Sequence, residues 1–201
     1  MFKQSAAAER ALLFDLKDLE RNWASSLRVN FNKNYFEIFG LSADYDVDQE
    51  VLGDRFLEIQ KQVHPDRFAA LTEQEKRVAM QWATFVNTAN ETLRAPLSRA
   101  IYLLKLKGVE LEHNPVLSPQ VLLDQIELRE TLEEIEVSEG GLEQIGSFCQ
   151  VVGDLIDGFQ IELREALKTD VGRAEKLVYE FQFLTKLLGS AKILEEKMLD
   201  Y

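Results

Sequence analysis

Apolar residues recur at the three- and four-residue spacing of an α-helix along almost the whole chain of 201 residues. Little in the sequence interrupts that spacing, since only 10 glycines and 4 prolines occur. We find no segment with the alternating pattern of a strand and no repeat of solenoid length. The sequence therefore predicts an all-α protein.

The charge and the cysteine content exclude several classes of function. The formal net charge is −12, so nucleic acid and an anionic membrane are unfavourable partners, because both require a basic protein surface. No apolar run approaches the roughly 20 residues of a membrane span, and acidic residues occupy the N-terminal stretch where a signal peptide would be apolar. Cys149 is the only cysteine, which fits a reducing compartment. We therefore expect a cytoplasmic protein without nucleic-acid or membrane partners.

The same inventory argues against a resident metal or cofactor. One cysteine and two histidines are too few for a cysteine-rich metal site or a cluster held by four thiolates. Glu110 and His113 have the Glu-x-x-His spacing of di-iron bundles, but those sites need a second copy and further carboxylates. A solvated linker is the simpler explanation of this pair, and Cys149 is expected to be a core residue. We predict no metal and no cofactor.

The N-terminal half is predicted to contain a helical hairpin. The spacing of apolar residues predicts an amphipathic helix over residues 1–33, which would either pack on the body of the protein or extend from it. After the aromatic stretch NYFEIFGL, a helix over about 48–63 ends before Pro65, because proline disfavours the helical conformation at the residue that precedes it. A loop at 64–71 then joins this helix to an antiparallel neighbour.

The neighbouring helix has a recognisable start. Thr72 and Glu75 have the spacing of a capping box, in which each side chain satisfies a backbone amide of the first turn. A further helical stretch, PLSRAIYLLKLKG, ends at Gly108.

The C-terminal part is predicted to be a three-helix bundle. Residues 109–117 contain Pro115 and show no clear period, so they are expected to form a connection. Ser118 and Pro119 suit the N-cap and the first turn of a helix that ends near residue 137. Two longer helices follow, at about 140–168 and 172–199. Residues 118–201 contain 18 acidic and eight basic residues, so most of the negative charge belongs to the bundle.

The tripeptide His64-Pro65-Asp66 occupies the loop of the predicted hairpin. Three such residues alone are common in ordinary turns. In this position, however, the proline fixes its own backbone and the two polar side chains should project into solvent. A rigid loop that presents an acid is suited to docking against an arginine of a partner. Nothing nearby in the sequence supplies a nucleophile or a set of metal ligands, so catalysis by the loop itself is not expected.

Several motifs occur in the order of a known family. NYFEIFGL, QVHPDRF and NTANETLRAPLSRAIYLL together resemble a J-domain. LLDQIELRETLEEIE and FLTKLLGSAKILEEKMLDY are similar to the client-binding domain of the HscB family of iron–sulfur co-chaperones. The resemblance covers residues 34–201. It implies a J-domain at 34–108, a linker at 109–117 and a client-binding three-helix domain at 118–201, after an N-terminal extension at 1–33. Eukaryotic relatives often carry a paired CxxC zinc module at the N-terminus. The sequence has no such module, which favours a bacterial-type protein.

The resemblance also implies partners and roles. In J-proteins the His-Pro-Asp loop contacts a DnaK-class chaperone and triggers its ATP hydrolysis, and HscB-type proteins deliver the scaffold protein IscU to the chaperone HscA. These roles fall on His64, Pro65 and Asp66, assisted by the basic residues Arg55, Lys61 and Arg67. The chain would then be a co-chaperone and not an enzyme. The alternatives are a J-protein with a different client and a helical adaptor in which the tripeptide is incidental.

A candidate client-binding face lies on the helix at 118–137. Its core stripe is Val121, Gln125, Leu128, Leu132 and Ile135. Beyond that stripe lie further apolar residues with an acidic border, namely Leu122, Leu123 and Ile126 with Glu127, Glu130 and Glu134. Phe183 lies off the core stripe of the last helix. These extra apolar residues have two possible explanations. Packing of three helices can bury a face wider than one stripe, or the residues form an exposed apolar patch that binds a protein. The resemblance implies the second, since these positions match the scaffold-binding face of the family.

Overall fold

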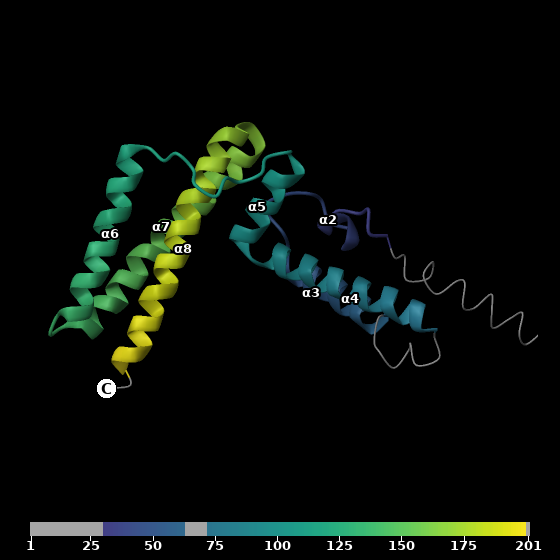
Figure 1. Cartoon of the computed structure of the whole chain (residues 1–201), viewed down its shortest axis with the longest axis horizontal. Helices are drawn as coiled ribbons and strands as arrows, with labels where there is room; N and C mark the ends of the chain where they lie inside the picture. The colour runs from purple at the N-terminus through teal and green to yellow at the C-terminus, as the bar shows by residue number, and fades with distance from the viewer. Residues whose placement is uncertain (1–29, 63–71, 200–201) are drawn as a thin grey trace, which may run out of the picture. The chain divides into compact units, whose positions relative to one another are not determined.

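The structure of the chain is a computed structural model that describes residues 30–62 and 72–199 (Figure 1). No strand occurs within these ranges, and the prediction of an all-α protein is confirmed. The helices in chain order are α2 (Tyr35–Ile38), α3 (Gln49–Gln62), α4 (Glu73–Arg94), α5 (Pro96–Leu106), α6 (Pro119–Val137), α7 (Gly141–Thr169) and α8 (Val171–Leu199). None of these helices is long and apolar enough to cross a membrane.

The chain divides into two compact units. The first unit comprises the described residues up to Ala43 together with Val47–Arg94. The second unit begins at Ala95 and also includes the short segment Asp44–Asp46. The family resemblance implied a first domain that extends to residue 108, whereas in the structure α5 belongs to the second unit and packs on α7 and α8.

The first described helix of the first unit, α2, is a capped single turn. Asn34 accepts a hydrogen bond from the Glu37 amide at 3.0 Å, and the Asn34 amide donates to the Glu37 carboxylate at 2.9 Å. The turn ends at Gly40, whose φ of 63° lies in the left-handed region that glycine adopts without steric cost. This geometry directs the side chains of Phe36 and Phe39 into the core, where both are fully buried.

The predicted helical hairpin of the first unit is present as α3 and α4, which pack against each other. The α4 helix starts as the sequence indicated, because the Thr72 amide donates to the Glu75 carboxylate at 2.9 Å and the Glu75 amide donates to Thr72 Oγ1 at 3.4 Å. Four residues of α4 at helical spacing are buried in the core: Trp82, Val86, Ala89 and Leu93. The connecting loop falls in 63–71, outside the described residues.

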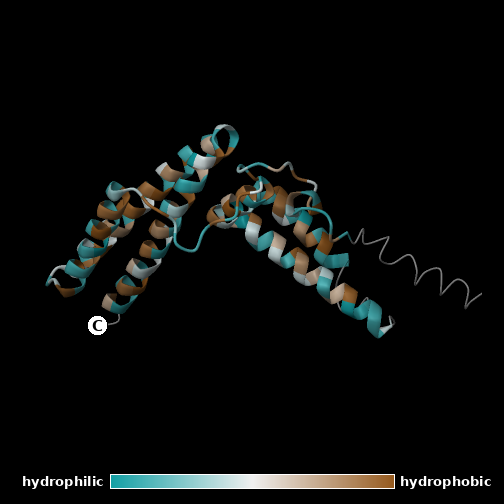
Figure 2. Cartoon of the chain, turned by 45° about the horizontal axis from the view of Figure 1, so that its top comes forward, coloured by the Kyte–Doolittle hydropathy of each residue, from teal (hydrophilic) through white to brown (hydrophobic). Residues whose placement is uncertain are grey.

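The second unit contains the predicted three-helix bundle. Ser118 caps α6, because its Oγ accepts a hydrogen bond from the Val121 amide at 3.3 Å. Hydrophilic and hydrophobic residues are interspersed along the helices of the bundle (Figure 2). The buried core cluster of the bundle consists of Ile135, Ile145, Phe148, Val152, Leu184, Leu187 and Ala191. Cys149 is half-buried beside this cluster, as expected, and burial raises the pKa of its thiol.

The turn at Asp44–Asp46 is also part of the second unit. Tyr45 is only 3% exposed, and the Arg99 guanidinium lies 5.0 Å from the centroid of its ring. Asp46 accepts a hydrogen bond from Arg164 Nε at 2.8 Å. This segment therefore anchors on α5 and α7.

Candidate functional site

The predicted chaperone-binding residues are only partly described. His64, Pro65, Asp66 and Arg67 lie outside the described residues. Arg55 and Lys61 are both exposed on α3. Arg55 and Lys61 are six residues apart, so their side chains leave the helix in directions about 120° apart around its axis. These two cations therefore do not form a single basic patch.

Arg55 also lines a cleft of about 510 Å³ in the first unit. Basic and acidic side chains meet there, since Lys33, Glu37 and Glu58 line the same cleft. The mixed charge favours neither an anionic nor a cationic ligand. We therefore assign no separate function to this cleft.

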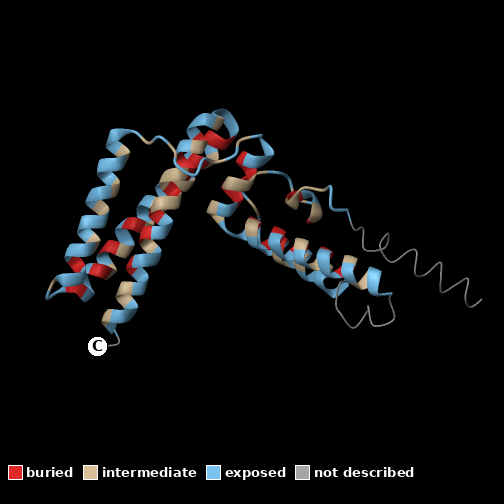
Figure 3. Cartoon of the chain, in the orientation of Figure 1, coloured by how far each residue is buried: buried red, intermediate tan, exposed pale blue. Residues whose placement is uncertain are grey.

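The apolar face predicted on α6 is exposed. Leu122, Leu123 and Ile126 are 46%, 54% and 50% accessible, respectively. The opposite side of α6 makes the core contacts, through Leu128, Leu132 and Ile135. Figure 3 accordingly shows α6 mostly in the colour of exposed residues. The alternative explanation, that bundle packing buries these three side chains, is wrong.

An acidic ridge runs beside this apolar face. Glu127, Glu130 and Glu134 are all exposed and follow one another at spacings of three and four residues. Such spacing places them along one side of the helix. The combination of a small apolar surface and an acidic border is typical of a protein-binding site.

Phe183 differs from the other candidate client-binding residues. It is half-buried and packs against the core cluster of the bundle. The Arg129 guanidinium lies 5.3 Å from the centroid of its ring, a cation–π distance. Phe183 thus lies beneath a neighbouring side chain and is not part of the open face made by Leu122, Leu123 and Ile126.

A groove of about 380 Å³ opens between α6, α7 and α8. It exists because α6 contacts the core cluster through residues of its C-terminal half, from Leu128 onward, and leaves space beneath its N-terminal half. Phe183 and Glu127 line this groove, whereas Leu122, Leu123 and Ile126 do not. The candidate residues therefore fall into two adjoining parts, an exposed face and a groove.

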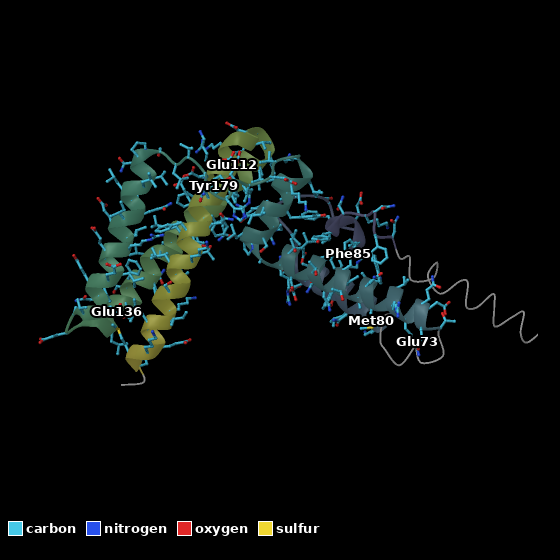
Figure 4. All side chains as sticks on the ribbon, viewed as in Figure 1. Glu73, Met80, Phe85, Glu112, Glu136 and Tyr179 are labelled. Atoms are coloured by element: carbon cyan, nitrogen blue, oxygen red, sulfur yellow. The ribbon has the colours of Figure 1, made fainter. Side chains whose placement is uncertain are left out.

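The predicted linker is held against the bundle. The Glu112 amide donates a hydrogen bond to the Tyr179 hydroxyl at 2.7 Å, and both residues lie where the linker passes α8 (Figure 4). Glu110 and His113 are exposed in the same segment. Among the described residues, no three histidine, cysteine, aspartate or glutamate side chains come together in a way that could hold a metal ion.

An all-α scaffold with an exposed apolar face defines a candidate protein-binding protein. Comparison with known proteins identifies its family. Residues 117–192 match the family model described as the HSCB C-terminal oligomerisation domain. The chain is 38% identical over 173 residues to the "Co-chaperone protein HscB homolog" of Shewanella pealeana, which covers 83% of this chain and 99% of the relative.

Solved structures show the same similarity. The chaperone HscB from Vibrio cholerae superimposes with a TM-score of 0.76 at 32% identity, over 82% of this chain and 99% of that one. Human co-chaperone HscB also gives a TM-score of 0.76, at 27% identity, over 82% of this chain and 83% of the human chain. The chain belongs to the HscB family of co-chaperones.

Proposed function

We propose that this chain is a J-domain co-chaperone of iron–sulfur cluster assembly in the cytoplasm. It stimulates the ATPase of a DnaK/HscA-class chaperone and presents an IscU-type scaffold protein to it, and it has no catalytic residues of its own. The observation that carries this proposal is the exposed apolar face of α6 in a chain whose family is HscB.

On the chaperone side, the proposed contact is the loop His64-Pro65-Asp66 of a J-domain at 34–108. The proline restricts the backbone, and the aspartate can accept paired hydrogen bonds from an arginine of the chaperone. Exposed cations on the preceding helix, Arg55 and Lys61, would add weaker electrostatic attraction, as would Arg67.

On the client side, the proposed contact is the face made by Leu122, Leu123 and Ile126. Full burial of one such side chain contributes about 1.5–3 kcal/mol, and roughly half of each is still available for burial. The three together can therefore supply several kcal/mol of affinity. Glu127, Glu130 and Glu134 would steer a basic client surface toward this face and act mainly on the association rate.

The test is a binding measurement with a purified IscU-type scaffold. Replacing Leu122, Leu123 and Ile126 together by alanine should weaken binding at least about tenfold, while the melting temperature stays close to that of the wild type. A matched triple variant, with alanine at Leu142, Ile161 and Ile193, removes three exposed apolar side chains elsewhere on the bundle. It should bind like the wild type. Equal binding by both triple variants would remove the α6 face from the function.

A further inference from the structure

The groove between α6, α7 and α8 combines an apolar floor with acidic walls. Its floor is formed by Leu128, Leu155, Phe159, Phe183 and Leu184. The acidic walls come from two helices: α6 supplies the carboxylates of Asp124 and Glu127, and α8 supplies that of Glu180. No lysine, arginine or histidine is among the described residues that line it. Its volume of about 380 Å³ is within the range of sites that enclose a ligand group.

Glu180 is the unusual member of this set. It is half-buried on α8, and its carboxylate makes no ion pair or side-chain hydrogen bond with the described residues. Burial raises its pKa above the ordinary value, and the negative charges of Asp124 and Glu162 raise it further. A carboxylate in such surroundings is stabilised by a cation that enters the groove.

We propose that the groove receives an arginine side chain of the client. The guanidinium would lie between Asp124 and Glu180, where its planar array of donors can serve two carboxylates. Its methylene stem would lie on Leu155 and Phe159. This inference rests on the proposed function, because the arginine belongs to the client that the α6 face binds.

Two features of the surroundings favour this occupant. The Arg129 guanidinium lies 5.3 Å from the centroid of the Phe183 ring, so an aromatic residue of the groove floor already accommodates a guanidinium. Glu127 borders both the groove and the exposed apolar face, so a client segment bound on that face is adjacent to the groove. A second copy of this chain is disfavoured, because residues 118–201 carry 18 acidic and eight basic residues and would repel one another.

The groove can be tested without the client. N-acetylarginine methylamide is titrated into the full-length protein, and the NMR signals of Phe159 and Leu155 are followed. The neutral isostere N-acetylcitrulline methylamide and the lysine analogue serve as comparison probes. We expect saturable shifts with the arginine probe, binding at least fivefold weaker in Glu180→Gln, and no shifts with citrulline. Equal shifts with citrulline, or tighter binding of the lysine analogue, would overturn the assignment of arginine.

A second measurement separates this inference from the proposed function. The double variant Asp124→Asn/Glu180→Gln should bind the client at least tenfold more weakly. A matched control, with Asn at Asp170 and Gln at Glu196, removes the same charge from exposed positions outside the groove and should stay within twofold of the wild type. Unchanged client binding by the groove variant would overturn the groove proposal alone. No client binding by the wild type would overturn the proposed function, and the arginine titration would still decide the groove.

The melting temperature at pH 7 distinguishes binding from a structural role. The raised pKa means that ionised Glu180 is disfavoured in the folded chain, so Glu180→Gln should melt at or above the wild-type temperature. A lower melting temperature would mean that Glu180 supports the fold, and would contradict a site that awaits a cation.

Discussion

Tyr45 is buried although acidic residues stand on both sides of it in the sequence. Its ring is covered by the Arg99 guanidinium, and its hydroxyl donates a long hydrogen bond of 3.5 Å to Gln160 Oε1. Burial raises the pKa of Tyr45 to about 12, although the positive charges of Arg99 and Arg164 act in the opposite direction. The neutral phenol is therefore part of the stable folded state.

This burial predicts how the stability of the protein depends on alkaline pH. The folded chain holds the Tyr45 proton more tightly than the unfolded chain, whose tyrosine pKa is about 10. The stabilising contribution is present below pH 10 and is lost as pH rises toward 12. Urea unfolding should show that the wild type loses roughly 2–3 kcal/mol relative to Tyr45→Phe across this range.

Tyr45→Phe is the appropriate comparison because it keeps the ring and removes only the ionisable hydroxyl. At pH 7 the two proteins should differ by less than about 1 kcal/mol, since the hydrogen bond to Gln160 is long. Parallel stability curves from pH 9 to 12 would show that the phenol is not buried as described.

Gly141 occupies a position where a side chain has no room. A Cβ atom there would lie 2.8 Å from the carbonyl oxygen of Ile135 and 2.9 Å from Met198 Cε. Gly141→Ala should therefore cost about 1–3 kcal/mol of unfolding free energy. Gly158 lies in the same helix with nothing within 4 Å of such a Cβ, so Gly158→Ala should instead add up to about 1 kcal/mol. Chemical denaturation that ranks the two variants in the opposite order would contradict this packing.

At the scale of elements, α6 is exposed to an unusual degree for a helix of a bundle. Ile135 is its only buried residue. It contacts the core cluster through Leu128, Leu132 and Ile135, and the rest of its apolar side chains remain accessible or line the groove. The element is thus anchored at its C-terminal half, and its remaining surface is available for a partner.

This division predicts a contrast between two residues of the same helix. Ile135→Ala should lower the unfolding free energy by about 2–5 kcal/mol, because it leaves a cavity in the core cluster. Leu123→Ala should change it by no more than about 0.5 kcal/mol, because Leu123 is 54% exposed. Equilibrium unfolding in urea measures both. A large loss in Leu123→Ala would mean that this side chain is structural.

Local signals were sufficient to predict most helix boundaries. Ser118 and the Thr72–Glu75 pair cap the starts of α6 and α4 by hydrogen bonds with backbone amides. Because each cap involves only residues close together in the sequence, the helix start can be predicted from the local sequence. The chain leaves the helical conformation just after α5, at Gly108, whose φ is 83°. The exposure of Leu122 and Leu123 did not follow from local signals alone, because three packed helices could also have buried these side chains; only the family resemblance favoured an exposed patch.

Contacts between distant segments were not predictable in this way. The burial of Tyr45 depends on Arg99, and the packing of α5 on α7 and α8 depends on surfaces far away in the sequence. The half-buried position of Phe183 and the charge environment of Glu180 arise only once three helices are assembled. Neither feature could be predicted from the local sequence, because hydrophobic periodicity and helix propensity describe one helix at a time.

At the scale of the whole molecule, charge is divided unequally along the chain. Residues 118–201 have a net charge of −10 from 18 acidic and eight basic residues, whereas residues 1–117 are nearly balanced, with 17 acidic and 15 basic residues. The two parts therefore present different electrostatic surfaces. This division fits the proposal that a J-domain contacts the chaperone and the bundle contacts a client with basic groups.

The most direct test of the central proposal is single-turnover ATP hydrolysis by a DnaK/HscA-class chaperone in the presence of the full-length protein. We predict an acceleration of at least about tenfold by the wild type, equivalent to about 1.4 kcal/mol of activation free energy, and none by His64→Gln. The triple alanine variant of Leu122, Leu123 and Ile126 should retain the acceleration measured without client, because its changes lie in α6. No acceleration by the wild type, or equal acceleration by His64→Gln, would contradict the account.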